Sequence, residues 1–238
     1  MDMEKQEREK NSVYIDQTRI LFLDPSSSCT GFAMVAINYV KKEAEIISAG
    51  PLWFNDKWDE GKKLRYIFSA IRNYFFILNQ GVSEIVCEEY FFPMGPQAKI
   101  KGSMVVPEMI GVVCLAAADE EPPLDFLKVS AQAWRKLLEI KPDQTPMLDK
   151  AGKPVLNKRG APKMSKDYKS PVARFVKTYL DIPDKFESNI TGNERQTPND
   201  VTDVLGMAIA VLKSRGITKF TAKPNWNTAH LCVKELVD

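Results

Sequence analysis

The most constraining feature of this 238-residue chain is a set of acidic residues placed at the ends of apolar segments. Two short apolar runs each end in an acid, and a long apolar run with helical spacing begins with two acids one turn apart. In chain order these acids are Asp24, either Glu88 or Glu89, Asp200 and Asp203. A carboxylate at the edge of an apolar segment is costly to bury alone, and oxygen ligands suit hard divalent cations. The set therefore predicts a shared metal site.

Each acid also has an ordinary structural interpretation. Asp24 precedes a proline and a serine-rich turn, where aspartate is common. Thr197 followed by proline matches a helix N-cap and first turn, so Asp200 is equally compatible with a capping box in which Asp replaces the usual Glu. Glu88 and Glu89 are adjacent in an expected strand, so their side chains point to opposite faces. At most one of these two glutamates is therefore expected at a shared site.

Apolar spacing along the chain predicts a mixed α/β domain. Strands are expected at 19–24, 31–37, 44–50, 84–90 and 124–129. Because the connections between the first three are short, we expect these three strands to run antiparallel. Apolar residues recur at three- and four-residue steps in expected helices at 61–80, 103–118, 131–138, 171–180 and 199–214. The pattern predicts a five-stranded mixed sheet flanked by helices, without an evident internal repeat.

Composition divides the chain and excludes several classes of protein. We expect a charged flexible tail at 1–18, a folded domain at 19–215 and a C-terminal extension at 216–238. The sequence contains no signal segment and no apolar run near the ~20 residues of a membrane span, which favours a cytoplasmic location. Four scattered cysteines without a C-x-x-C pair fit a reducing compartment and argue against a structural zinc site. The single histidine, His230, leaves little room for histidine-based catalysis.

One long segment, 141–168, has no apolar period and is interpreted as a basic loop or flap inside the domain. Residues 141–177 contain 10 lysines and arginines against 3 aspartates. A local basic excess beside an acidic metal site suits a polyanionic substrate. Taken alone, the same segment is equally compatible with a solvated lysine-rich loop.

Three motifs in this order resemble the RuvC family of Holliday-junction resolvases, within the RNase H-like superfamily. They are Leu23-Asp24-Pro25-Ser26 followed by Thr30-Gly31, then Val86-Cys87-Glu88-Glu89-Tyr90-Phe91, and finally Asn199-Asp200-Val201-Thr202-Asp203 with its apolar continuation. The family has Asp-Pro-Gly before a Thr-Gly, an Ile-Glu strand and a helix with Asp-x-x-Asp-Ala. The resemblance spans about 19 to 214. Ser26, which stands in place of the usual glycine, is one departure; the long basic segment and the C-terminal tail are others.

The resemblance implies an RNase H-like nuclease that resolves four-way DNA junctions as a homodimer, by paired symmetric nicks. It implies that Asp24, Glu88, Asp200 and Asp203 ligate two Mg²⁺ ions, with Mn²⁺ as a possible substitute. It favours Glu88 over Glu89, because Phe91 then matches an aromatic residue that contacts bases. It implies DNA contacts from the basic side chains Lys136, Lys158, Arg159, Lys163 and Lys166.

Several alternatives stay open on the sequence alone. The same acids serve other RNase H-like nucleases that cut flaps, other branched DNA or RNA–DNA hybrids. A catalytically silent nucleic-acid-binding module has the same fold. An ATP-using protein of the actin and sugar-kinase fold also places an early strand aspartate before a Ser/Thr-Gly turn, but its second phosphate loop and Gly-rich adenosine motif are not found in this sequence.

Overall fold

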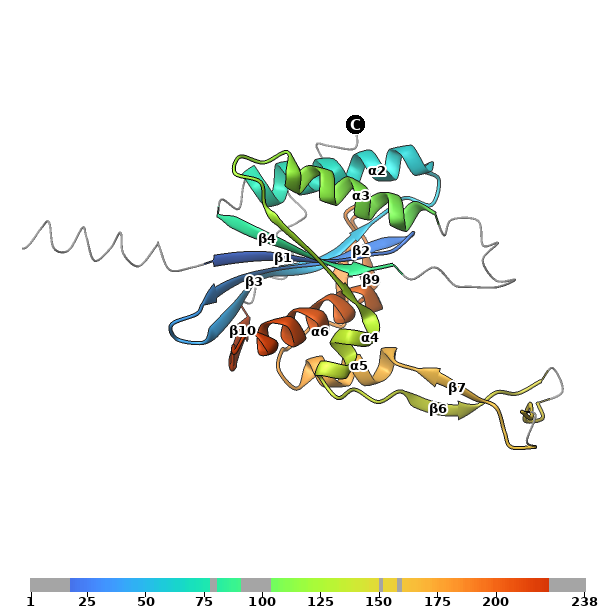
Figure 1. Ribbon diagram of the computed structural model, residues 1–238. Coiled ribbons are helices and arrows are strands. Elements are labelled where there is room, and N and C mark those ends of the chain that lie inside the picture. The colour runs from blue at the N-terminus through green and yellow to red at the C-terminus, as the bar shows by residue number, and fades with distance from the viewer. Residues whose placement is uncertain (1–17, 78–80, 91–103, 150–151, 158–159, 223–238) are drawn as a thin grey trace, which may run out of the picture.

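The computed structural model describes residues 18–77, 81–90, 104–149, 152–157 and 160–222. A six-stranded sheet with the order β10-β3-β2-β1-β4-β5 forms its centre (Figure 1). The first three strands are antiparallel neighbours, whereas β4 runs parallel to β1, β5 parallel to β4 and β10 parallel to β3. The strands are β1 Thr18–Pro25, β2 Cys29–Asn38, β3 Glu43–Trp53, β4 Val82–Glu89, β5 Asp125–Ser130 and β10 Lys219–Ala222.

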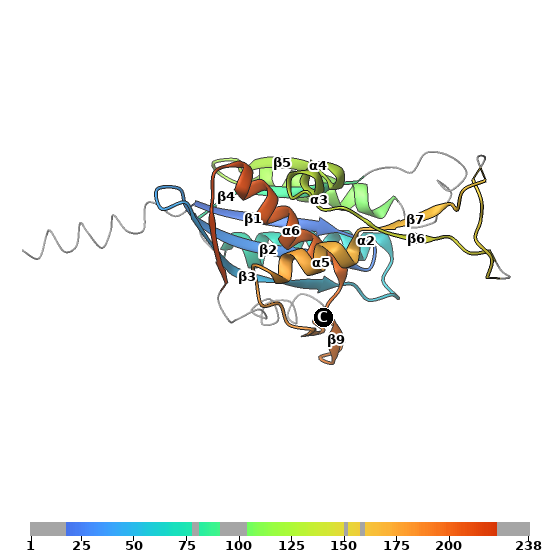
Figure 2. The same cartoon turned by 90° about the horizontal axis from the view of Figure 1, so that it is seen from below.

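Helices cover both faces of the sheet, as Figures 1 and 2 show. On one face lie α2 (Glu60–Ser69), its continuation in wider π-type turns, η1 (Ala70–Ile77), and α3 (Val105–Ala118). On the other lie α4 (Ala131–Leu137), α5 (Lys169–Lys177) and α6 (Asn199–Ser214). The mixed α/β sheet with antiparallel first strands, predicted from apolar spacing, is confirmed.

The central strands are apolar on both sides because helices pack on both sides. In β1, Ile20 and Phe22 belong to the core beneath α6, whereas Leu21 and Leu23 belong to the core beneath α2 and α3. All four side chains are fully buried. Since side chains alternate between faces, Asp24 continues the row of Ile20 and Phe22 and lies on the α6 side. The acid at the end of this strand is thereby directed toward α6.

The sheet has one strand more than the five expected from the sequence. β10 pairs with the start of β3, so four residues of the expected C-terminal extension belong to the sheet. Its alternating sequence, Lys-Phe-Thr-Ala, is too short and too polar to stand out as a strand. The expected tail at 1–17 and the end of the chain at 223–238 lie outside the described residues. No helix within the described residues is long and apolar enough to cross a bilayer.

The segment 141–168 is not a featureless loop. It begins and ends in an antiparallel ribbon of β6 (Asp143–Pro146) and β7 (Met164–Asp167), which extends away from the body of the molecule (Figures 1 and 2). Sequence reasoning missed these strands because all but one of their residues are exposed, which leaves no apolar alternation to detect. A second small hairpin, β8 (Lys185–Glu187) and β9 (Glu194–Gln196), precedes α6.

Candidate active site

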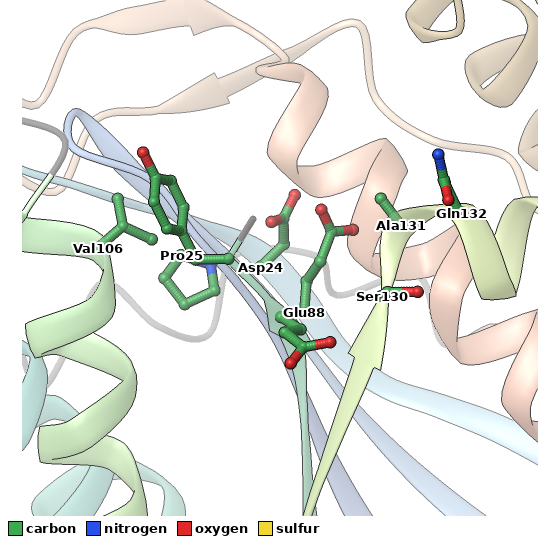
Figure 3. A pocket seen from close by; sticks show the side chains of 9 residues that line it. Asp24, Pro25, Glu88, Val106, Ser130, Ala131 and Gln132 are labelled. Atoms are coloured by element: carbon green, nitrogen blue, oxygen red, sulfur yellow. The ribbon is translucent and has the colours of Figure 1, made fainter. Parts of the chain in front are cut away.

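Two of the predicted acids lie side by side on adjacent parallel strands. β1 and β4 pair so that Leu23 faces Cys87, and the next residue of each strand is Asp24 and Glu88. Figure 3 shows both carboxylates projecting in the same direction from the sheet. Asp24 is only 7 % exposed, whereas Glu89 is exposed and follows on the opposite face. The structure therefore brings Glu88, rather than Glu89, beside Asp24.

The other two acids reach the same place because α6 begins against the sheet. Gly31, which pairs with Asp24 across β1 and β2, makes this approach possible. A Cβ atom on Gly31 would overlap the carbonyl of Asp200 and lie 3.0 Å from the backbone nitrogen of Val201. Asp203 follows one turn later and is 7 % exposed. The absence of a side chain at one position of β2 therefore sets the distance between α6 and the strand acids.

The capping-box interpretation of Asp200 is wrong. Pro198, not Thr197, occupies the N-cap position of α6 and makes no side-chain cap bond. The Thr197 hydroxyl donates instead to the carbonyl of Pro183, outside the helix. An Asp200 carboxylate oxygen lies 3.3 Å from Ser26 Oγ, which also donates to the carbonyl of Cys29. Ser26, the departure from the family's glycine, thus places a hydroxyl beside one of the acids.

Burial disfavours the charged forms of all four acids, and the charges of neighbouring carboxylates add to this effect at Asp24, Glu88 and Asp203. Loss of hydration raises the pKa of Asp24 well above its usual value, and the charges of Glu88, Asp200 and Asp203 raise it further. Burial likewise raises the pKa of Asp203 to about 7, although nearby Arg135 opposes the shift. The pKa values of Glu88 and Asp200 are also raised, mainly by burial. A bound cation would strongly stabilise the charged forms of these four carboxylates.

Two neighbouring residues of α4 contact these acids, and sequence reasoning assigned a role to neither. Trp134 is fully buried, and its indole Nε1 donates to Glu88 Oε2 at 2.8 Å. Arg135 Nη2 lies 3.4 Å from Asp203 Oδ2, and its guanidinium stacks on the rings of Trp134 and Tyr168. The sequence signal was the turn from an apolar strand into a Ser130-capped helix, which brings the first turn of α4 to the carboxyl edge of the sheet.

The donor set fits a divalent metal ion better than it fits an ion pair alone. Asp203 Oδ1 is buried without a hydrogen-bond partner among the described residues, although its other oxygen faces Arg135. In the same part of the chain, no three His, Cys, Asp or Glu side chains already surround a common point as metal ligands. Four oxygen donors with raised pKa values and one unsatisfied carboxylate oxygen are nonetheless the chemistry that Mg²⁺ or Mn²⁺ complements.

A cavity of about 310 Å³ opens directly beside the acids. Asp24 and Glu88 lie between its two sides, with Val106 of α3 on one side and the start of α4 on the other (Figure 3). Its lining residues are Asp24, Pro25, Glu88, Glu89, Tyr90, Val106, Ser130, Ala131 and Gln132 (Figure 3). This volume lies at the lower end of the range for sites that enclose small organic groups. The cavity offers hydrogen-bonding groups, an aromatic residue and an apolar wall next to the acids.

The predicted DNA-contacting residues that the structure describes lie on its exposed surface. Lys136 is exposed on α4, and the cation that contacts the acids is its neighbour Arg135. Lys163 and Lys166 are exposed on the segment that leads into and forms β7. The other three predicted contacts, Phe91, Lys158 and Arg159, lie outside the described residues.

Comparison of the whole structure with solved structures identifies the fold. Thermus thermophilus RuvC in complex with a Holliday junction substrate superimposes with a TM-score of 0.53 at 14% identity, over 84% of this chain and 96% of that one. This chain has the RNase H-like fold. A second structure of T. thermophilus RuvC gives a TM-score of 0.50 at 15% identity, covering 85% of this chain and 99% of the other.

The yeast mitochondrial Holliday junction resolvase is similar to the same degree. Its TM-score is 0.52 at 12% identity, over 84% of this chain and 79% of that protein. No protein-family model and no curated protein sequence matches the chain. At these identities the similarity demonstrates a shared fold, and the chemistry has to be argued from the residues themselves.

Proposed function

We propose that this protein is a divalent-metal-dependent endonuclease that resolves four-way DNA junctions. The observation that carries the proposal is the convergence of Asp24, Glu88, Asp200 and Asp203 from two strands and a helix onto one edge of an RNase H-like sheet. Each of these acids has a raised pKa, and the principal cause in each case is burial. Carboxylates held in this electrostatic conflict are a costly arrangement for a purely structural domain. Mg²⁺, or Mn²⁺ in its place, balances their charge.

The four acids would hold the metal ions, which supply an activated water and stabilise the leaving oxygen during phosphodiester hydrolysis. Trp134 fixes the orientation of Glu88 through its indole hydrogen bond. Ser26 does the same for Asp200 through its hydroxyl group. The Arg135 guanidinium lies over the rings of Trp134 and Tyr168, 4.9 and 5.2 Å from their centroids, and these contacts keep its positive charge at the edge of the acids, where a phosphate would approach.

The cavity beside Asp24 and Glu88 suits one nucleotide next to the cut phosphate. Tyr90 and Val106 provide contact surface for a base or sugar, whereas Ser130 and Gln132 provide hydrogen-bonding groups. Lys136, Lys163 and Lys166, with Lys158 and Arg159 of the same basic segment, are proposed as phosphate contacts farther out. Phe91 is retained as a proposed base contact.

We also propose that two copies pair through the outer face of α3, so that each copy cuts one of two symmetry-related strands. Leu115, which is 64% exposed on this helix, and Met104, which is 56% exposed at its N-cap, supply the apolar surface for this contact. Leu115→Glu is expected to give a monomer that nicks single strands without pairing the cuts. Light scattering and a cruciform-plasmid assay report the two effects separately.

The test of the proposed function is cleavage of an immobile four-way DNA junction, with linear duplex, flap and RNA–DNA hybrid as controls. Paired symmetric nicks on the junction that require Mg²⁺ and stop in EDTA are the expected result. Cleavage of the hybrid or the flap instead keeps the metal site but rejects junction resolution. Binding without cleavage of any substrate identifies a silent nucleic-acid-binding module.

A further inference from the structure

The arm that extends from the body contains a duplicated turn. Residues 147–154 read Met-Leu-Asp-Lys-Ala-Gly-Lys-Pro and residues 155–162 read Val-Leu-Asn-Lys-Arg-Gly-Ala-Pro. Leucine, lysine, glycine and proline recur at the same four positions of each eight-residue unit. The internal repeat escaped the sequence analysis because it is short and occurs within a polar, lysine-rich segment.

The two units also share their backbone geometry. Leu148 bridges to Pro154 in the first unit, and Leu156 bridges to Pro162 in the second. The third side chain of each unit accepts from the backbone four residues later, at 2.9 Å in the first unit and 3.2 Å in the second. Their glycines have φ angles of 76° and 75°, a conformation that other residues adopt reluctantly. The described residues of the two units therefore close by the same bridge and the same side-chain hydrogen bond.

A closed ring of backbone hydrogen bonds joins the two turns to the β6–β7 ribbon. Met147 N donates to the carbonyl of Lys163 at 2.8 Å, and Lys163 N donates to that of Val155 at 2.7 Å. Val155 N completes the ring by donating to the carbonyl of Met147 at 2.8 Å. These three residues are spaced by eight, one at the start of each unit and one just after the second. We call this three-way element, residues 147–163, the trefoil.

The base of the ribbon is tied to the helices that border the acids. Arg174 of α5 pairs with Asp143 at the start of β6, at 2.9 Å. Asp167 at the end of β7 accepts from the backbone of Lys169 at 2.9 Å, in the first turn of α5. β6 follows α4, the helix that carries Trp134 and Arg135. The arm therefore starts beside the acids, and at ~3.3 Å per residue its four-residue strands place the trefoil roughly 13 Å farther out.

The trefoil combines a positively charged sequence with paired apolar side chains that are exposed to solvent. Its sequence has five lysines and arginines against one aspartate. Leu148 is 60% exposed and Leu156 is 58% exposed, at equivalent positions of the two turns. Architectural proteins insert exposed apolar side chains into the minor groove of duplex DNA, while neighbouring basic side chains contact phosphates. The exposed leucines and the cations of the trefoil are of the same kind.

We propose that the trefoil is a bipartite clamp for duplex DNA, in which the two turns contact the arm that leads away from the cut site. The proposal builds on the proposed nuclease function but concerns binding and not cleavage. The turns contribute equivalently, through lysine and arginine contacts to phosphates and leucine contacts within the groove. Charge complementarity favours DNA over a second copy of the same arm, since two positively charged trefoils repel each other.

The repeat allows one turn to be removed without disturbing the other. In a variant lacking 155–162, Pro154 is followed directly by Lys163, which already pairs with Met147. In a variant lacking 147–154, Val155 takes the place of Met147 against Lys163. Either deletion therefore leaves one simple hairpin in register with β6 and β7. A third variant, with 147–163 replaced by an Asn-Gly turn, removes both turns.

Equilibrium binding to a four-way junction and to linear duplex, measured across a salt series, tests the clamp. Each single deletion removes two cations within its turn and is expected to lower affinity about 10-fold and the salt slope by ~2. The affinity of the Asn-Gly variant should fall by the product of the factors found for the two single deletions. Junction and duplex should be affected equally, because the contacts lie on a duplex arm. Leu148→Ser with Leu156→Ser should weaken binding ~5-fold without changing the salt slope.

Three outcomes overturn the clamp. Unchanged affinity of both single-deletion variants makes the trefoil a bystander. A loss of affinity for the junction alone would place the trefoil's contacts at the branch point. Conversion of a dimer to a monomer by the deletions would show that the trefoil joins two copies of the protein. The urea midpoint of unfolding of each variant should stay near that of the wild type, which shows that the variants fold. If wild-type protein cuts no junction, the proposed nuclease function fails, but the duplex-binding comparison still decides the clamp.

Discussion

The acid site and the trefoil are held in place by opposite means. The acids lie on regular elements whose positions are set by long-range packing, under α6 and against Trp134. The trefoil is built by local backbone hydrogen bonds within 17 residues, and its large apolar side chains remain in water. Chemistry that needs several charges at fixed distances is placed where packing dictates each position. Recognition of a long polyanion tolerates a local, exposed element, because its contacts are repeated and individually weak.

The largest expected effect of a single substitution is at the acids. Asp24→Asn, Glu88→Gln and Asp203→Asn should each lower single-turnover junction cleavage by at least ~10³-fold, more than the ~10–100-fold typical of losing a partner behind a metal ligand. DNA affinity should stay nearly unchanged in EDTA. Asp125→Asn, at the other end of the sheet, is the matched control. An acid variant that cuts at the wild-type rate would remove that residue from the proposed metal site.

The next largest effect concerns the contact that positions α6. Gly31→Ala puts a methyl group into the backbone of Asp200, so the helix has to move or the sheet has to deform. We expect a loss of ~2–4 kcal/mol in the free energy of unfolding, measured with urea. Gly61→Ala, where the added Cβ meets only an ordinary contact at 3.5 Å, is the control and should be neutral or stabilising. Equal stability of the two variants would contradict the close packing of α6.

A smaller effect tests whether Trp134 acts on Glu88 beyond filling space. Trp134→Phe keeps an aromatic ring but removes the indole donor, and we expect ~10-fold slower cleavage. Trp53→Phe, a buried tryptophan of β3 outside the acid site, serves as the packing control. Both variants should lose stability to a similar extent. If both also lose activity equally, the hydrogen bond to Glu88 has no special role.

The smallest expected effect is a pH-dependent change in stability without metal. The pKa of Asp24 is raised in the folded state, so the folded protein binds more protons than the unfolded chain above about pH 4. The free energy of unfolding therefore falls as pH rises, and Asp24→Asn escapes this loss. In EDTA at pH 7.5 we expect the variant to be more stable by at least ~1 kcal/mol. The difference should shrink toward pH 4, and Mg²⁺ should stabilise only the wild type. If the free energies of unfolding of the wild type and Asp24→Asn change in parallel with pH, the carboxylate of Asp24 is not destabilised by its surroundings.

The sequence was most informative where the pattern of residue types has a single structural explanation. Apolar runs of strand length and apolar spacing of helical period predicted five strands of the sheet and the principal helices, because burial on two faces requires them. The order of the acids predicted that strand ends and a helix start would share an edge. Thr197 was misleading, because a Thr-Pro pair shortly before an acid is typical of a helix N-cap. In the structure its hydroxyl donates to the carbonyl of Pro183 instead.

The sequence by itself determined the α/β fold, because the fold follows from local patterns of burial, and it predicted the acids that we propose as metal ligands. What only the tertiary structure decided is the environment of those acids. Trp134 and Arg135 reach Glu88 and Asp203 across 46 and 68 positions of the chain, and no local pattern encodes such a contact. The sixth strand and the ring of the trefoil likewise depend on backbone hydrogen bonds. Almost every residue carries the same backbone N–H and C=O groups, so the sequence does not specify which of them will pair. Only the folded structure shows these pairings.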